Sequence, residues 1–250
     1  MTIGNMINLY GDDYTPYVGN LVNHLPMAQL AIYKMTGDSE KVRTYSKFFI
    51  GRTNINRILD GYPSINSLEE ALGNRDQYQA CLDSIRRDLT EGDLDVYINH
   101  LLNRYKLGLS SGLFHTSIRL AYAIEGLSLD FSLISEVERA LAYYVTAYRE
   151  SKLFTRKIQA SSIKEEMDGL VNDNYIIDIL GKHNSLGQKI KALYSEKYYL
   201  DKGFIIDGNP DDKIKALLEL LIPAYYFSGN IVTLHCITGL HAIIVLKDYF

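Results

Sequence analysis

A chain of 250 residues is long enough for one large domain or two small ones, and 47% hydrophobic residues suffice for a substantial core. A net charge of −4, with both signs interspersed along the chain, argues against a nucleic-acid partner. Two cysteines give no disulfide framework, and the N-terminal residues lack the basic and apolar regions of a signal peptide, so we expect a cytoplasmic protein.

Helical periodicity dominates, and the first long segment with this pattern, residues 17–35, ends at Gly37. Pro26 lies inside this segment. Because proline has no backbone N–H to donate, a helix either begins or kinks at this position. Either geometry places His24 at the entrance of a helix.

Further helices are predicted in chain order at residues 39–50, from Leu68 after a capping box, and at 77–89, 93–105, 130–148, 163–167, 175–200 and 214–221. The helix at 77–89 is amphipathic, and we expect it to be mostly exposed. Small residues at 108–112 precede the helix that contains His115 and allow it to pack closely against a neighbour. Residues 203–206 have the composition of a strand but no evident partner. The sequence therefore predicts an all-α fold, a single compact multi-helix domain over residues 1–250.

The last stretch, residues 228–250, is apolar, β-branched and long enough for a helix. The one long run without charges, residues 222–246, overlaps this stretch and contains Gly, Asn and two histidines, and the polar side chains among these are costly in a lipid bilayer. We therefore interpret it as a buried helix of the domain and expect no membrane partner.

Four of the six histidines lie in apolar segments: His24, His115, His235 and His241. A buried imidazole needs a partner for its ring nitrogens, and imidazole is a common ligand of iron, zinc and copper. We therefore expect a buried histidine cluster that holds a transition metal. His235 and His241 are six residues apart, so both reach one centre only if the helix bends, which Gly239 permits. The alternative is four separately satisfied core histidines.

The sequence lacks the motifs of several other enzyme classes. There is no G-x-G-x-x-G dinucleotide fingerprint, Walker A loop, G-x-S-x-G elbow, C-x-x-C or H-E-x-x-H motif. His100 and His183 lie among polar residues, and we interpret both as solvated. Cys236 lies in an apolar run, which favours a structural thiol over a nucleophile.

Three histidine-containing segments resemble the questin oxidase-like family. They are residues 23–27 (NHLPM), 112–125 (GLFHTSIRLAYAIE) and 233–242 (TLHCITGLHA), in the family's order and spread over nearly the whole chain. The resemblance implies a helical domain that oxidises a cyclic ketone, a quinone or a polyketide-like aromatic molecule with O2. It also implies a non-haem iron centre with four histidines and a carboxylated lysine, for which Lys247 is the lysine near the motif.

Carried over to this chain, the resemblance places His24, His115 and His235 on the metal. The family's further histidine, four residues after His115, is replaced by Arg119, so that either His241 completes the metal site or Arg119 binds an anionic substrate. Tyr122 is expected in the substrate pocket.

We therefore predict an oxidoreductase that binds a small-molecule substrate, uses iron (with zinc or manganese as alternatives) and takes electrons from NADPH if it needs an external reductant. Two alternatives stay open. One is a non-catalytic helical binding protein that keeps the family fold, and the other is a metal-free Baeyer–Villiger-type oxidase.

Overall fold

The computed structural model describes residues 1–19, 21–59, 61–90 and 92–250. Helices make up most of the described chain, and the strands are only two to four residues long. The predicted all-α class is therefore confirmed. Packing divides the chain into two compact units, residues 1–151 with 238–250, and residues 152–237. The single domain over residues 1–250 stays a prediction.

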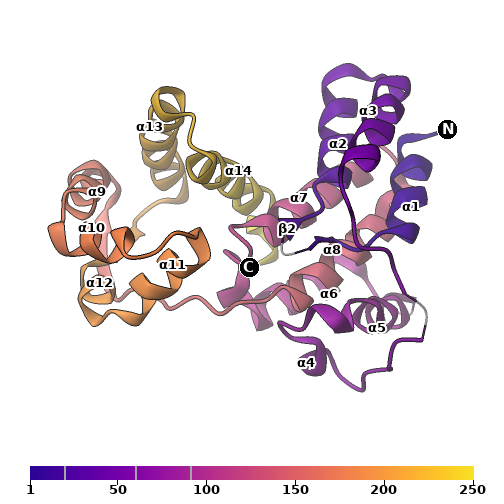
Figure 1. Cartoon of the computed structure of the whole chain (residues 1–250), viewed down its shortest axis with the longest axis horizontal. Coiled ribbons are helices and arrows are strands. Elements are labelled where there is room, and N and C mark those ends of the chain that lie inside the picture. Colours follow the sequence, from indigo (N-terminus) through magenta and orange to yellow (C-terminus); the bar gives the residue numbers. More distant parts are fainter. Residues whose placement is uncertain (20, 60, 91) are drawn as a thin grey trace. The chain divides into compact units, whose positions relative to one another are not determined.

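The first unit contains the helices that carry most of the core (Figure 1). In chain order its elements are α1 (Ile3–Asp13), β1 (Tyr17–Val18), β2 (Leu21–Val22), α2 (Leu25–Thr36), α3 (Ser39–Arg52), α4 (Leu68–Ala71), α5 (Tyr78–Thr90), α6 (Leu94–Arg104), α7 (His115–Leu127) and α8 (Ile134–Thr146). Short 3-10 helices η1 (Arg75–Gln77), η2 (Lys106–Gly108), η3 (Phe131–Leu133) and η5 (Lys247–Tyr249) connect or end these elements.

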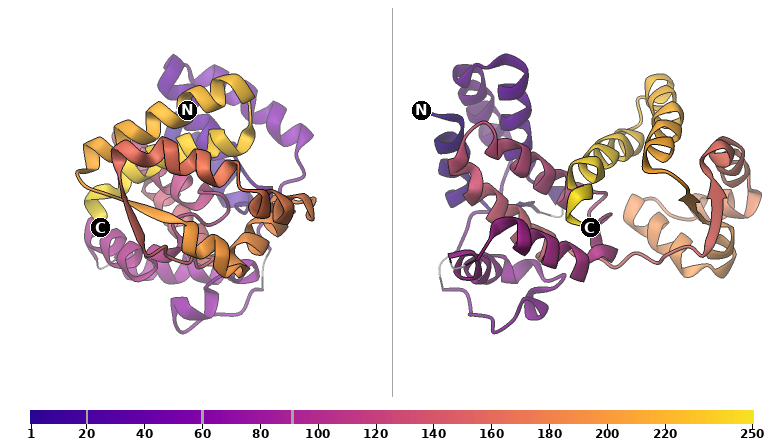
Figure 2. Two further views of the ribbon diagram at one scale, coloured as in Figure 1. Left: turned by 90° about the vertical axis from the view of Figure 1, so that its left-hand side faces the viewer. Right: turned by 180° about the vertical axis from the view of Figure 1, so that it is seen from behind.

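Helix α8 is the centre of this unit and packs against α5 and α7. Its residues from Ala140 to Val145 are all at most 1% exposed, so the second half of the helix is apolar and buried on every side. A second, smaller core of Ile3, Met6, Ile7, Leu30, Val42 and Leu133 joins α1, α2 and α3. Figure 2 shows these three helices together in the N-terminal part of the chain.

The second unit contains β3 (Arg156–Gln159), η4 (Ala160–Ser162), α9 (Ile163–Val171), α10 (Asn174–Gly181), α11 (Leu186–Ser195), α12 (Lys197–Lys202), β4 (Phe204–Asp207) and α13 (Pro210–Ser228). β3 and β4 pair in parallel, with Arg156 opposite Phe204. The division between the units falls inside the last long helix, α14 (Ile231–Leu246), after Ile237.

Several expectations were wrong in detail. Tyr17–Val18 and Leu21–Val22 form the antiparallel pair β1–β2, and helix α2 starts only at Leu25. The strand at 204–207 does have a partner, β3. Helix α5 is not solvated, because one face from Tyr78 to Ile85 lies in the core.

Helix α14 is also less buried than expected, with only Gly239, Ala242 and Leu246 shielded from solvent. By length and mean hydropathy (1.5), Ile231–Tyr249 is apolar enough to cross a membrane, and 17% of that window is buried.

Candidate metal centre

His24 immediately precedes α2, as the position of Pro26 in the first turn predicts. The neighbouring Asn23 is 4% exposed and fixes the backbone at this entrance. Its side-chain oxygen accepts a hydrogen bond from the Leu25 N–H (3.0 Å), and its Nδ2 donates to the Thr15 carbonyl (3.1 Å). The His24 ring is therefore held on a backbone segment with little freedom to move.

His115 is the first residue of α7 and follows an unusual left-handed turn. Gly112, Leu113 and Phe114 have φ angles of 58°, 59° and 66°. A side-chain-bearing residue in this conformation costs about 1–3 kcal/mol, and such strain is concentrated at functional sites. Phe114 packs so closely on Gly239 that a Cβ at position 239 would lie 2.6 Å from the ring Cγ. The turn thus fixes the start of α7 and the direction of the His115 side chain.

His235 lies on α14, one turn before Gly239. Helix α14 runs without a break from Ile231 to Leu246, and its residues from Thr238 onward belong to the first unit. The end of this segment is anchored there, because the Tyr249 carbonyl accepts hydrogen bonds from Asn99 Nδ2 (3.1 Å) and Asn103 Nδ2 (3.0 Å).

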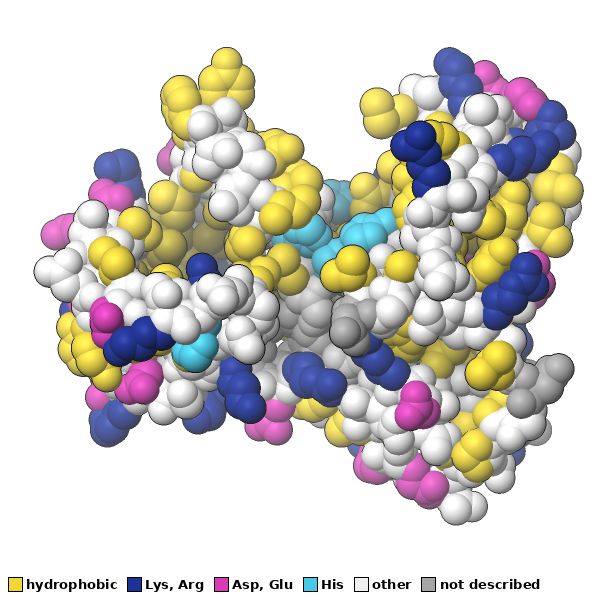
Figure 3. Space-filling model, viewed as in Figure 1, with side chains coloured by type: hydrophobic (Ala, Val, Ile, Leu, Met, Phe, Trp, Pro, Cys, Tyr) yellow, Lys and Arg dark blue, Asp and Glu magenta, His cyan; other side chains and the backbone are white. Residues whose placement is uncertain are grey.

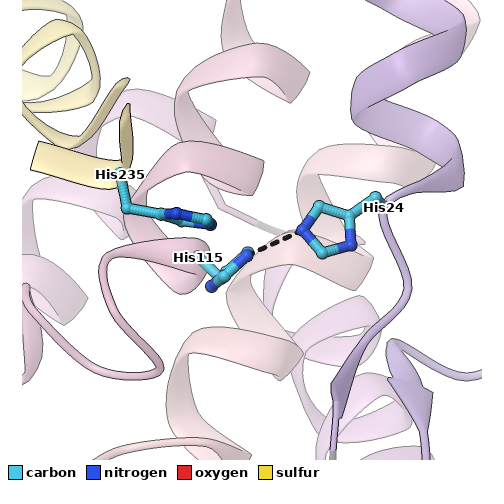
Figure 4. Close-up of side chains that lie close together, drawn as sticks. All are labelled: His24, His115 and His235. Atoms are coloured by element: carbon cyan, nitrogen blue, oxygen red, sulfur yellow. Dashed lines mark hydrogen bonds between the residues drawn. The ribbon is translucent and has the colours of Figure 1, made fainter. Parts of the chain in front are cut away.

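The three side chains converge, as Figure 4 shows. One potential ligand atom from each of His24, His115 and His235 lies within 4.8 Å of the others. The Nε2 atoms of His24 and His115 are 2.8 Å apart. His115 is buried, His235 is half-buried and His24 is exposed, so the cluster is accessible from one side. Figure 3 shows histidine side chains at the surface beside hydrophobic ones. The predicted cluster is confirmed for these three histidines.

Each of the three rings has a backbone carbonyl as the partner of its Nδ1. The pairs are His24 with Val22 (2.9 Å), His115 with Gly112, and His235 with Ile231 (2.6 Å). A carbonyl oxygen only accepts hydrogen bonds, so each Nδ1 carries the hydrogen and donates it. In a neutral imidazole this leaves the lone pair on Nε2, which is the nitrogen that can bind a metal.

His241 lies apart from this group. Helix α14 continues through Gly239, and a histidine six residues after His235 lies on another face of a continuous helix. His241 Nε2 is instead 3.4 Å from Glu125 Oε1, and its ring centre is 6.1 Å from that of Tyr122. The structure therefore brings together three of the four predicted metal ligands, and it places Tyr122 beside the fourth.

Arg119 and Lys247 are also outside the histidine group. Arg119 is 2% exposed, and its Nε donates to Glu136 Oε1 at 2.8 Å. Burial is the largest single effect and lowers the pKa of this guanidinium, but the charge and hydrogen bond of Glu136, with the nearby Tyr78 and Tyr143, together outweigh it, so the net pKa is raised. Lys247 is exposed beyond the end of α14. A substrate contact by Arg119 and carboxylation of Lys247 stay predictions.

A pocket of about 420 Å³ lies against the cluster within the first unit. His24 and His115 form part of its wall, and Val22, Phe49 and Tyr143 contribute apolar surface. Burial raises the pKa of the Tyr143 hydroxyl well above its usual value, so this group is neutral at physiological pH. The pocket combines an apolar interior with two imidazoles, which suits a small organic ligand.

Sequence analysis gave no role to three residues of this region, Asn23, Arg75 and Arg149. Asn23 had a local signal, because a polar residue precedes the histidine at a helix entrance. Arg75 and Arg149 line the same pocket as His24 and His115, although they are distant from both histidines in the sequence. No spacing rule connects them, and only the fold brings them together.

No protein-family model matches the sequence, and neither a curated protein nor a solved structure is detectably similar to it. The likeness to questin oxidase-like proteins therefore rests on the three histidine-containing segments alone.

Proposed function

We propose that the protein is an oxidoreductase that holds iron on His24, His115 and His235 and oxidises a small organic substrate with O2. One observation carries this proposal: three imidazoles converge while each donates its Nδ1 hydrogen to a backbone carbonyl. Metal-binding histidines nearly always donate their second ring N–H in this way, which fixes the tautomer and the ring orientation.

The distance between His24 and His115 supports a cation at this point. With both Nδ1 atoms protonated, two neutral rings would direct lone pairs at each other across 2.8 Å. Such an arrangement is repulsive unless a proton or a metal ion lies between them. A proton bridges only two nitrogens, whereas the proximity of His235 suits an ion with several ligands. Three neutral imidazoles fit a divalent transition metal.

The ligand set agrees with the metal named in this proposal. Three imidazoles would hold iron, although imidazole suits zinc equally well. The resemblance to questin oxidase-like proteins favours iron over zinc.

When bound, iron would supply redox and Lewis-acid chemistry beside the pocket that His24 and His115 line. The protein residues position the substrate. Phe49 and Tyr143 hold an apolar body, while Val22 accepts the His24 hydrogen and so keeps that ring directed at the cluster. The resemblance to questin oxidase-like proteins suggests a cyclic ketone, a quinone or a polyketide-like aromatic substrate.

Metal analysis tests this proposal. Purified protein is loaded anaerobically with Fe(II), desalted and measured by plasma mass spectrometry. We expect about one iron per chain in the wild type, a loss of iron in His115→Ala, and full retention in His100→Ala, which alters an exposed histidine. Wild-type protein that retains no iron, zinc or manganese would rule the proposal out.

A further inference from the structure

Two guanidinium groups, those of Arg75 and Arg149, line the pocket beside the histidine cluster. No acidic side chain is among the described residues that line this pocket. Within the described part of the chain, no carboxylate forms an ion pair with either arginine. Other arginines of the first unit, such as Arg86 and Arg119, are paired with glutamates. The pocket therefore carries positive charge that its described walls do not balance.

Both guanidinium groups are held in place by the backbone. Arg149 Nη1 donates to the Gly73 carbonyl (3.0 Å), and Arg75 Nη1 donates to the Gly19 carbonyl (3.2 Å). Arg75 also lies over the Tyr17 ring, 4.7 Å from its centre. A guanidinium has five N–H donors, so each group keeps donors for a ligand. Because the groups are already ordered, little side-chain freedom is lost when they bind an anion.

The two arginines are also neighbours in the fold. Gly73, which anchors Arg149, is two residues before Arg75, so one loop carries the first guanidinium and holds the second. Planar guanidinium groups recognise carboxylates through paired hydrogen bonds. Such a pair of arginines forms an anion-binding part of the wall of a pocket that His24 and His115 also line.

The other side chains that line the pocket indicate the chemistry of the uncharged part of the ligand. Leu21, Val22, Phe49, Tyr143 and Ala147 are apolar, and about 420 Å³ is near the small end of ligand pockets. A ligand with several charges would leave polar groups unpaired against these side chains. A single carboxylate on an apolar body satisfies both parts of the pocket.

We propose that this pocket binds an apolar organic acid, with its carboxylate on Arg75 and Arg149 and its carbon skeleton directed at His24 and His115. That this acid is the substrate of the protein rests on the proposed function. It assigns anion binding to two arginines of the pocket wall, whereas Arg119 is neutralised by Glu136.

Calorimetric titration with two matched probes tests the inference. 2-Naphthoate carries the carboxylate, and 2-naphthamide has the same ring system without the charge. We expect the wild type to bind naphthoate about tenfold or more tightly than naphthamide, because hydrogen bonds to a charged group are the stronger ones. The double variant Arg75→Gln/Arg149→Gln should bind both probes equally, and the single variant Arg75→Gln should lose part of the preference.

Two further variants separate this inference from the proposed function. Arg52→Gln alters an exposed arginine outside the pocket and should keep the preference. His115→Ala should lose iron but keep the preference, since the arginines do not depend on the metal.

If the preference for naphthoate survives in Arg75→Gln/Arg149→Gln and disappears in His115→Ala, the metal binds the carboxylate and the arginine assignment is wrong. Equal binding of both probes by the wild type would also overturn it. An arginine-dependent preference in a wild type that holds no metal would support the anion site and defeat the proposed iron centre.

Discussion

The Nε2 atoms of His24 and His115 lie 2.8 Å apart, although each ring already donates its Nδ1 hydrogen to a backbone carbonyl. Two neutral imidazoles in these tautomers have no hydrogen to share between their Nε2 atoms. The proposed metal ion would accept both lone pairs, and a ligand atom of the third ring, that of His235, lies within 4.8 Å of the other two.

The three converging histidines should differ from the fourth in their effect on iron content. His24→Ala, His115→Ala and His235→Ala should each lose most of the bound iron, because each removes one of three ligands. His241→Ala should retain it, since this ring lies beside Glu125. Iron content and circular dichroism are measured together, so that metal loss in a folded variant is distinguished from unfolding. Loss of iron in a folded His241→Ala variant would contradict this expectation and show that His241 is a metal ligand.

Metal binding should also stabilise the fold. A ligand at 100 times its dissociation constant stabilises the native state by about 2.7 kcal/mol, which raises Tm by several degrees. We expect this increase in the wild type and not in His115→Ala. Acidification should remove it, because protons compete for the Nε2 lone pairs. Scanning calorimetry with and without a chelator measures the difference, and identical transitions in the wild type would count against a bound metal.

Gly239→Ala should disturb the contact between α14 and the turn before His115. The added Cβ would meet Phe114 Cγ at 2.6 Å, and overpacking of this kind costs about 1–3 kcal/mol. We expect a lower free energy of unfolding in urea and weaker metal binding. Gly187→Ala is the matched control, because it also lies in a helix but has open space around it. There the change should be neutral or stabilising by up to about 1 kcal/mol.

Glu136→Ala should be among the more damaging substitutions in the core. Glu136 is 1% exposed and pairs with both Arg119 and Arg139, so its removal leaves two buried guanidinium groups without this carboxylate. We expect a loss of about 3–5 kcal/mol in the free energy of unfolding. Glu138→Ala, on the same helix, breaks a more exposed pair with Arg86 and should cost at most about 1 kcal/mol. Similar losses in both variants would contradict this assignment.

Buried tyrosines should make the protein sensitive to alkali. Burial raises the pKa of Tyr78 to about 12, an effect that exceeds the lowering by the nearby charges of Arg119 and Arg139. Between pH 10 and 12 the unfolded tyrosine therefore loses its proton while the folded one keeps it. The unfolded state then binds fewer protons, so stability falls as pH rises.

Tyr78→Phe should remove this contribution. Its hydroxyl is buried without a hydrogen-bond partner among the described residues, so the substitution should be nearly neutral at pH 7. At pH 12 the variant should be more stable than the wild type by about 2–3 kcal/mol. Urea unfolding at both pH values measures this, and an equal difference at pH 7 and pH 12 would contradict the raised pKa.

The parts of the fold that sequence predicted well are those that local chemistry determines. Pro26 and Gly37 mark the two ends of α2, because proline lacks an N–H and glycine adopts the left-handed conformation that ends the helix, with φ of 63°. Gly108, one of the small residues before α7, is itself closely packed, since a Cβ on it would lie 2.4 Å from the Tyr148 ring. His24 at a helix entrance followed from the same reasoning.

What the sequence did not reveal depends on contacts between distant segments. β3 and β4 are four residues each and separated by several helices, so neither shows a sustained alternating pattern. The side chain of His241 lies away from the cluster because the helix continues through Gly239. The sequence could not show this, because a glycine permits a bend without requiring one. The pocket position of Arg149 has no sequence signal at all.

X-ray absorption at the iron edge tests the central claim most directly. The sample is iron-loaded wild-type protein after removal of free metal, with His115→Ala treated in the same way. We expect a first shell that contains three imidazole nitrogens at about 2.1 Å, and its loss in the variant. A shell of oxygen atoms only, without imidazole scattering, would contradict a metal centre built from His24, His115 and His235.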